Sequence, residues 1–138
     1  DRAYKAVNEY RQKFPQKAVT FYAQNYPAMG WAVFMAGGSC PVIPCTDKAF
    51  LKDAAAMEVE ETNTDEYKKM VKSDIGSIIY SKSGTEIPVQ LSSGKYVLKY
   101  IHPASGKIET INKSLKINGL YKLKVPDKKE GIYWFHKL

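Results

Sequence analysis

The side chains most often used for catalysis or metal binding are few in this chain and lie far apart. Its two histidines, His102 and His136, belong to no nucleophile or metal-ligand pattern. Its two cysteines, Cys40 and Cys45, are close enough to close a small loop if the backbone allows it. Prolines stiffen that backbone, so two free thiols, buried or in a loop, remain the alternative. We expect no metal and no cofactor.

Carboxylates gather at one place, where Glu58, Glu60 and Glu61 follow one another closely. No partner acid, histidine or cysteine stands at a spacing that suits metal binding or acid–base catalysis. We therefore interpret these glutamates as a solvated edge.

A polar loop, Gln24, Asn25 and Tyr26, follows a strand expected at residues 17–22 and precedes an apolar helix. In α/β folds, binding residues gather where strands end and loops begin. We predict that these three residues bind substrate. The alternative is ordinary turn chemistry, which also favours Asn and Pro.

The apolar helix is expected over residues 28–36, where every residue is apolar or glycine. A helix that is apolar on all sides must be buried on all sides, so Trp31, Phe34 and Met35 should lie inside the protein. Gly37 and Gly38 provide its stop. We expect Trp31 or Phe34 to contact the second half of the chain or a partner chain.

The remaining periodicity predicts an α+β protein with two parts, residues 1–72 and 73–138. The first part has helices expected at 3–13, 47–57 and 64–71, and a βαβ unit formed by strand 17–22, the apolar helix and a strand at 42–43. The second part alternates with period two, and turn signals at Ser93-Gly94 and Asn118-Gly119 divide it into short strands. Short strands with such spacing predict an antiparallel β-sandwich. The expected strands are 77–80, 86–91, 95–102, 107–111, 114–117, 120–125 and 132–135.

The net charge of +7 comes entirely from residues 71–138, which hold twelve lysines, no arginine and five acids. The lysines fall at alternate strand positions, so they should face water and discourage pairing between sheet edges. Binding of a polyanion is the alternative. We expect no nucleic-acid partner, because such surfaces usually mix arginine with lysine. No apolar run is long enough to span a bilayer.

Several motifs of the second half resemble a known family. They are an aromatic–x–x–Pro–x–x–Gly turn at Tyr100–Gly106, a last strand carrying Trp134 after Pro126, and an opening strand at residues 78–80. This pattern is similar to the C-terminal β-sandwich, often labelled collagen-binding, of apiosidase-like glycoside hydrolases of Bacteroidetes. The stretch WAVFMAGGS from Trp31 looks like the end of the (β/α)8 barrel that precedes the sandwich in that family.

The resemblance implies that residues 1–72 close a barrel and that residues 73–138 are a non-catalytic accessory domain stabilising it. It further implies a secreted, periplasmic or cell-surface enzyme acting on polysaccharide or oligosaccharide. The direct partner would be the remainder of the same polypeptide or a second copy.

One departure from the family concerns catalysis. Members carry a catalytic Glu at the end of the strand before the closing helix, whereas this chain reads Phe21-Tyr22-Ala23-Gln24-Asn25 there. Glycoside hydrolysis normally needs two carboxylates across the scissile bond. We therefore expect that this segment alone is not catalytic. Either the acids lie upstream, or this relative is not catalytic at that position. The alternative is a stand-alone glycan- or protein-binding module in which Trp134 and Tyr100 stack on sugars, although strand aromatics are more often core.

Overall fold

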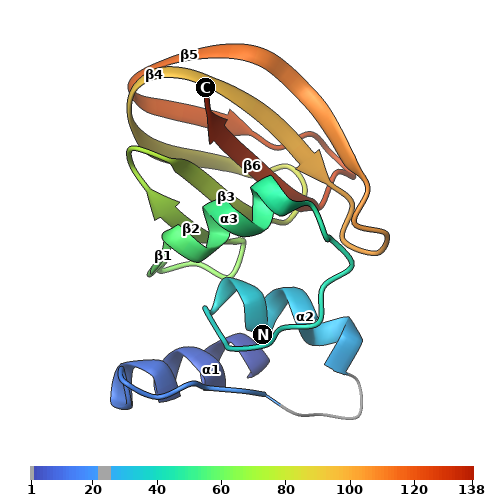
Figure 1. The fold of residues 1–138 in the computed structure, drawn as a ribbon. Coiled ribbons are helices and arrows are strands. Elements are labelled where there is room, and N and C mark those ends of the chain that lie inside the picture. The colour runs from blue at the N-terminus through green and yellow to red at the C-terminus, as the bar shows by residue number, and fades with distance from the viewer. Residues whose placement is uncertain (1, 22–25) are drawn as a thin grey trace. The chain divides into compact units, whose positions relative to one another are not determined.

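The computed structural model describes residues 2–21 and 26–138, and the side chains of these residues other than 26–28 (Figure 1). The chain divides into two compact units, residues 1–44 and 45–138. The boundary expected at 72/73 falls inside the second unit.

The first unit contains two helices, α1 (Arg2–Lys13) and α2 (Tyr26–Met35). α1 buries Ala3, Tyr4 and Val7, which share one helical face, and it ends shortly before Pro15 as expected. The guanidinium of Arg11 donates a hydrogen bond to the carbonyl of Ala36, just beyond α2. This bond fixes the last turn of one helix against the end of the other.

Gly37 ends α2 through backbone geometry that favours glycine. Its φ is +68°, its N–H donates to Phe34 O, and the next amide donates to Val33 O. These two bonds form a Schellman motif, which satisfies carbonyls that the last helical turn leaves open. Trp31 and Phe34 are each only 7% exposed, so the burial expected for this helix is confirmed.

The βαβ unit predicted for the first part is wrong. Residues 17–21 and 41–43 form no strand, and the backbone bond from Ser39 N to Val19 O reaches a residue that precedes the second segment. Instead, residues 41–43 lie against α2, where a Cβ on Gly30 would come within 1.7 Å of Val42 O. A segment that packs against a helix has no adjacent strand with which to form the backbone hydrogen bonds of a sheet. The described residues therefore show no end of a barrel.

The second unit begins with α3 (Lys48–Ala56). Asp47 is its N-cap, and the Asp47 carboxylate accepts a 2.8 Å hydrogen bond from Phe50 N. A carboxylate at this position satisfies an amide that would otherwise lack a helical partner. The helix agrees with the sequence prediction for residues 47–57.

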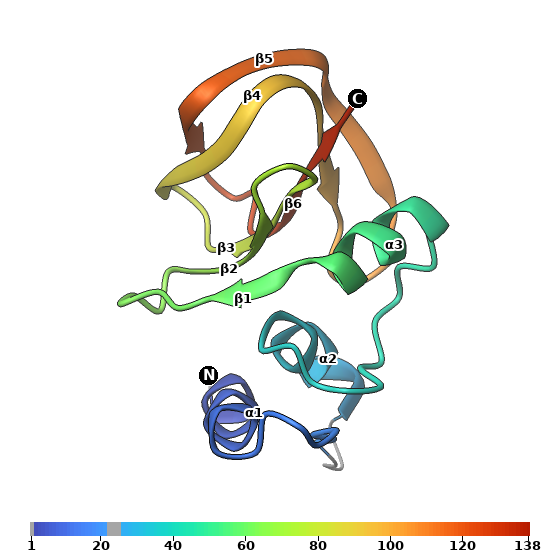
Figure 2. The same ribbon diagram turned by 60° about the vertical axis from the view of Figure 1, so that its left-hand side comes forward.

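The rest of the unit is one antiparallel sheet of six strands in the order β1-β2-β3-β6-β4-β5. The strands are β1 (Glu58–Glu60), β2 (Tyr67–Lys72), β3 (Gly76–Ser81), β4 (Glu86–Ile101), β5 (Ile108–Lys124) and β6 (Gly131–Lys137). The predicted two-sheet sandwich is therefore wrong. β4 and β5 form one long hairpin that arches over the other strands, as Figure 2 shows.

The two glycine signals that predicted turns instead form a bend in this hairpin. Leu91 pairs with Gly119 and Gly94 with Ile117, so Ser93 and Asn118 lie opposite each other where the register shifts. The Ser93 hydroxyl donates to the Asn118 side-chain oxygen at 2.7 Å. Such a bulge bends the ladder without ending it. The single β4–β5 pair therefore contributes side chains to both sides of the core.

The short helix predicted from Thr64 to Val71 is also wrong, because this stretch contributes β2. The Thr64 hydroxyl does accept a hydrogen bond from Glu66 N, at 3.1 Å, but this bond closes a turn. β2 then pairs on one side with β1 and on the other with β3. Pairing with two neighbours outweighs the local helix signal.

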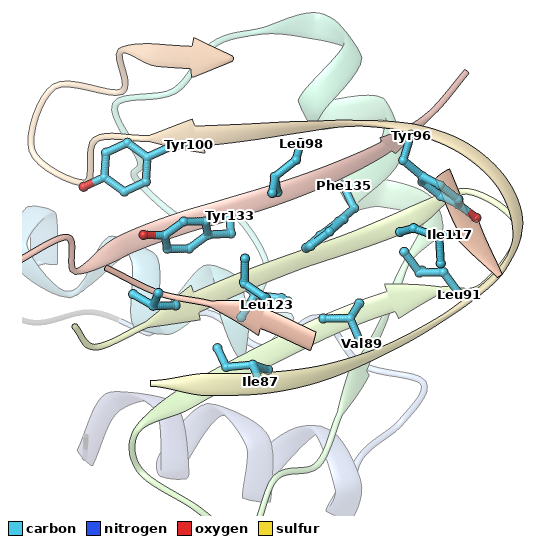
Figure 3. Close-up of a cluster of buried hydrophobic side chains, with 12 residues drawn as sticks. Ile87, Val89, Leu91, Tyr96, Leu98, Tyr100, Ile117, Leu123, Tyr133 and Phe135 are labelled. Atoms are coloured by element: carbon cyan, nitrogen blue, oxygen red, sulfur yellow. The ribbon is translucent and has the colours of Figure 1, made fainter. Parts of the chain in front are cut away.

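The concave side of the bent sheet holds an apolar core drawn from β3, β4, β5, β6 and the residue after β5 (Figure 3). The two halves of β4 contribute to opposite sides of it, with Ile87, Val89 and Leu91 across from Tyr96, Leu98 and Tyr100. Its other buried members are Ile79, Ile117, Leu123, Val125, Tyr133 and Phe135. None of the helices in the described ranges combines the length and apolar character that a bilayer crossing requires.

Candidate functional site

The predicted substrate-binding residues fall largely outside what the structure describes. Gln24 and Asn25 lie outside the described residues. Tyr26 is the first residue of α2, and its side chain is likewise not described. Their role in binding stays a prediction.

A buried carboxylate, Asp53, joins α3 to the outer face of β6. Asp53 is 6% exposed, and its Oδ2 accepts a hydrogen bond from Trp134 Nε1 at 2.9 Å. The same oxygen lies 2.7 Å from His136 Nδ1. The Trp134 ring is fully buried and meets Phe50 of α3 edge to face, with 5.4 Å between ring centres. Two hydrogen bonds and an aromatic contact thus dock α3 on the sheet.

This cluster has a pattern that sequence periodicity could have revealed. Phe50, Asp53, Ala54 and Met57 lie at helical spacings of three and four, so Asp53 stands on the buried stripe of α3. A buried carboxylate must be hydrogen-bonded, which implies donors on the facing strand. Alternation along β6 places Trp134 and His136 on one face, where those donors lie.

A second titratable cluster surrounds Glu109, near the turn that joins β4 to β5. Its carboxylate lies 2.9 Å from His102 Nε2. Lys107 Nζ and Lys129 Nζ are each 3.8 Å from it. The contact with His102, followed by the charges of both lysines, lowers the pKa of Glu109. A carboxylate held in its ionised form suits a charge network and does not suit a general acid.

Three tyrosines close to this cluster have hydroxyl groups bonded within the protein. Tyr100 donates to Glu130 O at 2.8 Å, Tyr133 donates to Lys129 O at 2.9 Å, and Tyr80 donates to the Glu130 carboxylate. Burial raises the pKa of Tyr133 to about 12. The pKa of Tyr80 is also raised, mainly by burial and to a smaller extent by the neighbouring Glu130. These phenols remain protonated donors that tie the loop after β5 to the core.

The aromatic residues suggested for sugar stacking are not on the surface. Trp134 is fully buried and Tyr100 is only 4% exposed. Lys99 lies 4.3 Å from the Trp134 ring centre and Lys129 lies 5.0 Å from that of Tyr100. The stacking role that the alternative gave to Trp134 and Tyr100 is therefore wrong, and both rings belong to the packed interior, the commoner place for strand aromatics.

The remaining candidates take local structural roles. Glu58 and Glu60 lie on the edge strand β1, and Glu60 forms an ion pair with the buried Lys69 of β2. Cys40 and Cys45 are free thiols, the first exposed and the second buried. Burial raises the pKa of Cys45. Neither group supplies a catalytic constellation.

Known proteins give one family match and three structural matches to this chain. A family model described as a domain of unknown function, DUF6298, matches residues 1–57. No curated protein matches. Three solved chains match, one of them titled "Glycoside hydrolase", with a TM-score of 0.43 and 16% identity over 57% of this chain. The matched region is 19% of that chain, so this chain spans only a small part of its length. The finer resemblance to apiosidase-like enzymes stays a prediction.

Proposed function

We propose that residues 45–138 are a non-catalytic accessory unit of a secreted, periplasmic or cell-surface carbohydrate-active enzyme. In this proposal the unit stabilises the remainder of the same polypeptide, which carries the catalytic carboxylates. Gln24, Asn25 and Tyr26 contribute to carbohydrate binding by the parent enzyme. The carbohydrate class comes from the sequence resemblance described above.

One observation supports the accessory role. The polar groups of the largest buried side chains are bonded within the unit. Trp134 donates to Asp53, and Tyr133 and Tyr100 donate to backbone carbonyls of the loop after β5. Tyr96, the remaining large polar aromatic of the core, donates to Ser92 O at 2.8 Å. Groups used in this way hold the fold together, because a buried donor without a partner is costly.

The test uses the polypeptide encoded by the whole gene, beginning with the coding sequence upstream of Asp1. The proposal expects a catalytic domain there, with two carboxylates placed for glycoside hydrolysis. A version ending at Pro44 should melt at a lower temperature, while its kcat/KM at a temperature where both versions are folded should be unchanged. A start codon close to Asp1 with no further domain would remove the proposal.

A stand-alone binding module remains the second candidate, and one surface feature favours it. The hairpin formed by β4 and β5 carries seven lysines and two glutamates over residues 86–124. The binding surface would then be charged, rather than built from the buried rings of Trp134 and Tyr100. Retention of the full chain on immobilised polysaccharides would support this candidate.

A further inference from the structure

Two lysines on the bend of the β4–β5 hairpin face each other directly. Lys95 of β4 is the register partner of Lys116 of β5, and both side chains are exposed. Residues directly opposite in an antiparallel pair project on the same face with Cβ atoms about 5 Å apart, and like charges there are unfavourable. Neither lysine forms an ion pair with any acid of the described residues.

The other lysines of this outer face differ in that respect. Lys122 and Lys124 lie 3.3 and 3.9 Å from the two carboxylate oxygens of Glu86. Like Lys116, both are exposed lysines of β5, but the carboxylate of Glu86 partly neutralises their charge. Lys95 and Lys116 therefore form a local excess of positive charge.

Protection of a sheet edge accounts for Lys116 but not for Lys95. β5 is an edge strand, so a lysine at position 116 discourages pairing with another sheet. β4 lies between β6 and β5, and Leu138 N donates to the carbonyl of Lys95. Lys95 therefore protects no free edge, and its charge calls for another reason.

Two polar side chains continue the same face. Ser93 and Asn118 are exposed, lie next to the lysines in alternation and share the hydrogen bond across the bend. Because the Asn118 oxygen accepts that bond, its NH₂ group is left to donate outward. Two ammonium groups beside an amide and a hydroxyl match an acidic sugar, whose carboxylate or sulfate lies next to ring hydroxyls.

We propose that Lys95, Lys116, Ser93 and Asn118 form a binding site for the acidic sugar units of an anionic polysaccharide. The choice of polysaccharide rests on the proposed function. Two features of the surface favour it over nucleic acid. Residues 71–138 contain no arginine, and none of the exposed large side chains of the hairpin is aromatic, so bases would find no stacking platform.

The test measures binding of the full chain to polygalacturonate by affinity electrophoresis and calorimetry, with neutral dextran and single-stranded DNA in parallel. Affinity for polygalacturonate should fall as salt rises, because bound cations are released on association. Lys95→Gln/Lys116→Gln should lower the affinity about tenfold and reduce the salt slope by about 1 per lysine. Lys95→Arg/Lys116→Arg should retain binding.

The matched control is Lys122→Gln/Lys124→Gln, which removes the same charge from the same face and should change affinity at most about twofold. Equal losses in the two double variants would mean that net charge alone is responsible, and would overturn the proposal. Tighter binding to DNA than to polygalacturonate, equal binding to dextran, or no binding at low salt would each overturn it as well. None of these results bears on the melting and kcat/KM test of the accessory role, so the two proposals fail separately.

Discussion

Replacing Asp53 should destabilise the second unit more than any surface change. Asp53→Ala removes the acceptor of Trp134 Nε1 and the partner of His136, while the indole stays fully buried. An unsatisfied buried donor costs about 1–3 kcal/mol, and the lost contact with His136 adds to it, so we expect a loss of about 2–4 kcal/mol. Asp53→Asn keeps one oxygen for the indole and should lose about half as much.

A double-mutant cycle separates this bond from general damage to α3. Trp134→Phe removes the donor and keeps an aromatic ring against Phe50. If the carboxylate acts through the indole, Asp53→Ala should cost about 1 kcal/mol less in the Trp134→Phe background. The assay is urea unfolding of the full chain followed by far-ultraviolet circular dichroism, which does not depend on the tryptophan itself.

The control is Asp74→Ala, which removes a carboxylate that lies exposed in the loop between β2 and β3. It should change the free energy of unfolding by less than about 0.5 kcal/mol. The account of α3 docking would be refuted if Asp53→Ala had an equally small effect, or if its cost were the same in both backgrounds.

Three further changes follow from the structure. Lys116→Gln should stabilise the chain by about 0.5 kcal/mol by removing the repulsion with Lys95, a gain that shrinks as salt rises, and urea unfolding at two ionic strengths measures it. The raised pKa of Tyr133 contributes folding stability that is complete below its unfolded pKa near 10 and is lost as pH rises toward the folded pKa of about 12. Tyr133→Phe should therefore flatten the decline of the free energy of unfolding across that pH range. Gly37→Ala should cost about 1 kcal/mol in thermal unfolding because φ is +68° there; no change would mean that the Schellman motif does not hold the end of α2.

Local signals in the sequence predicted the elements that depend on neighbours along the chain. α1 and α3 lie where helical periodicity predicted them, and Gly37 ends α2 as expected. β3 and β6 also lie where short apolar runs predicted strands. In these cases the residues that define an element also define its ends.

Signals whose meaning depends on distant partners predict the wrong structure. Ser93-Gly94 and Asn118-Gly119 each look like a tight turn, and only their mutual pairing makes them a bend in one hairpin. Thr64 looks like a helix cap, and only the neighbouring strands make the following residues a strand. The first of these pairings decides between a two-sheet sandwich and one curved sheet. Neither pairing is visible in a local window of sequence.

The candidate clusters show the same division. Asp53 could have been found from its place on a buried stripe, whereas its pairing with Trp134 and His136 crosses more than 80 residues. The convergence of His102, Lys107 and Lys129 on Glu109 likewise needs the turn after β4 and the loop after β5 to meet. Opposed lysines on β4 and β5 require the exact register of the hairpin.

The most direct test of the accessory role is the comparison of the whole-gene polypeptide with a version ending at Pro44. Calorimetric melting and glycoside hydrolysis would be measured on the same samples. The proposal predicts a lower melting temperature for the shortened version and an unchanged kcat/KM at a temperature where both are folded. Loss of kcat with an unchanged melting temperature would contradict it, because residues 45–138 would then take part in the chemistry.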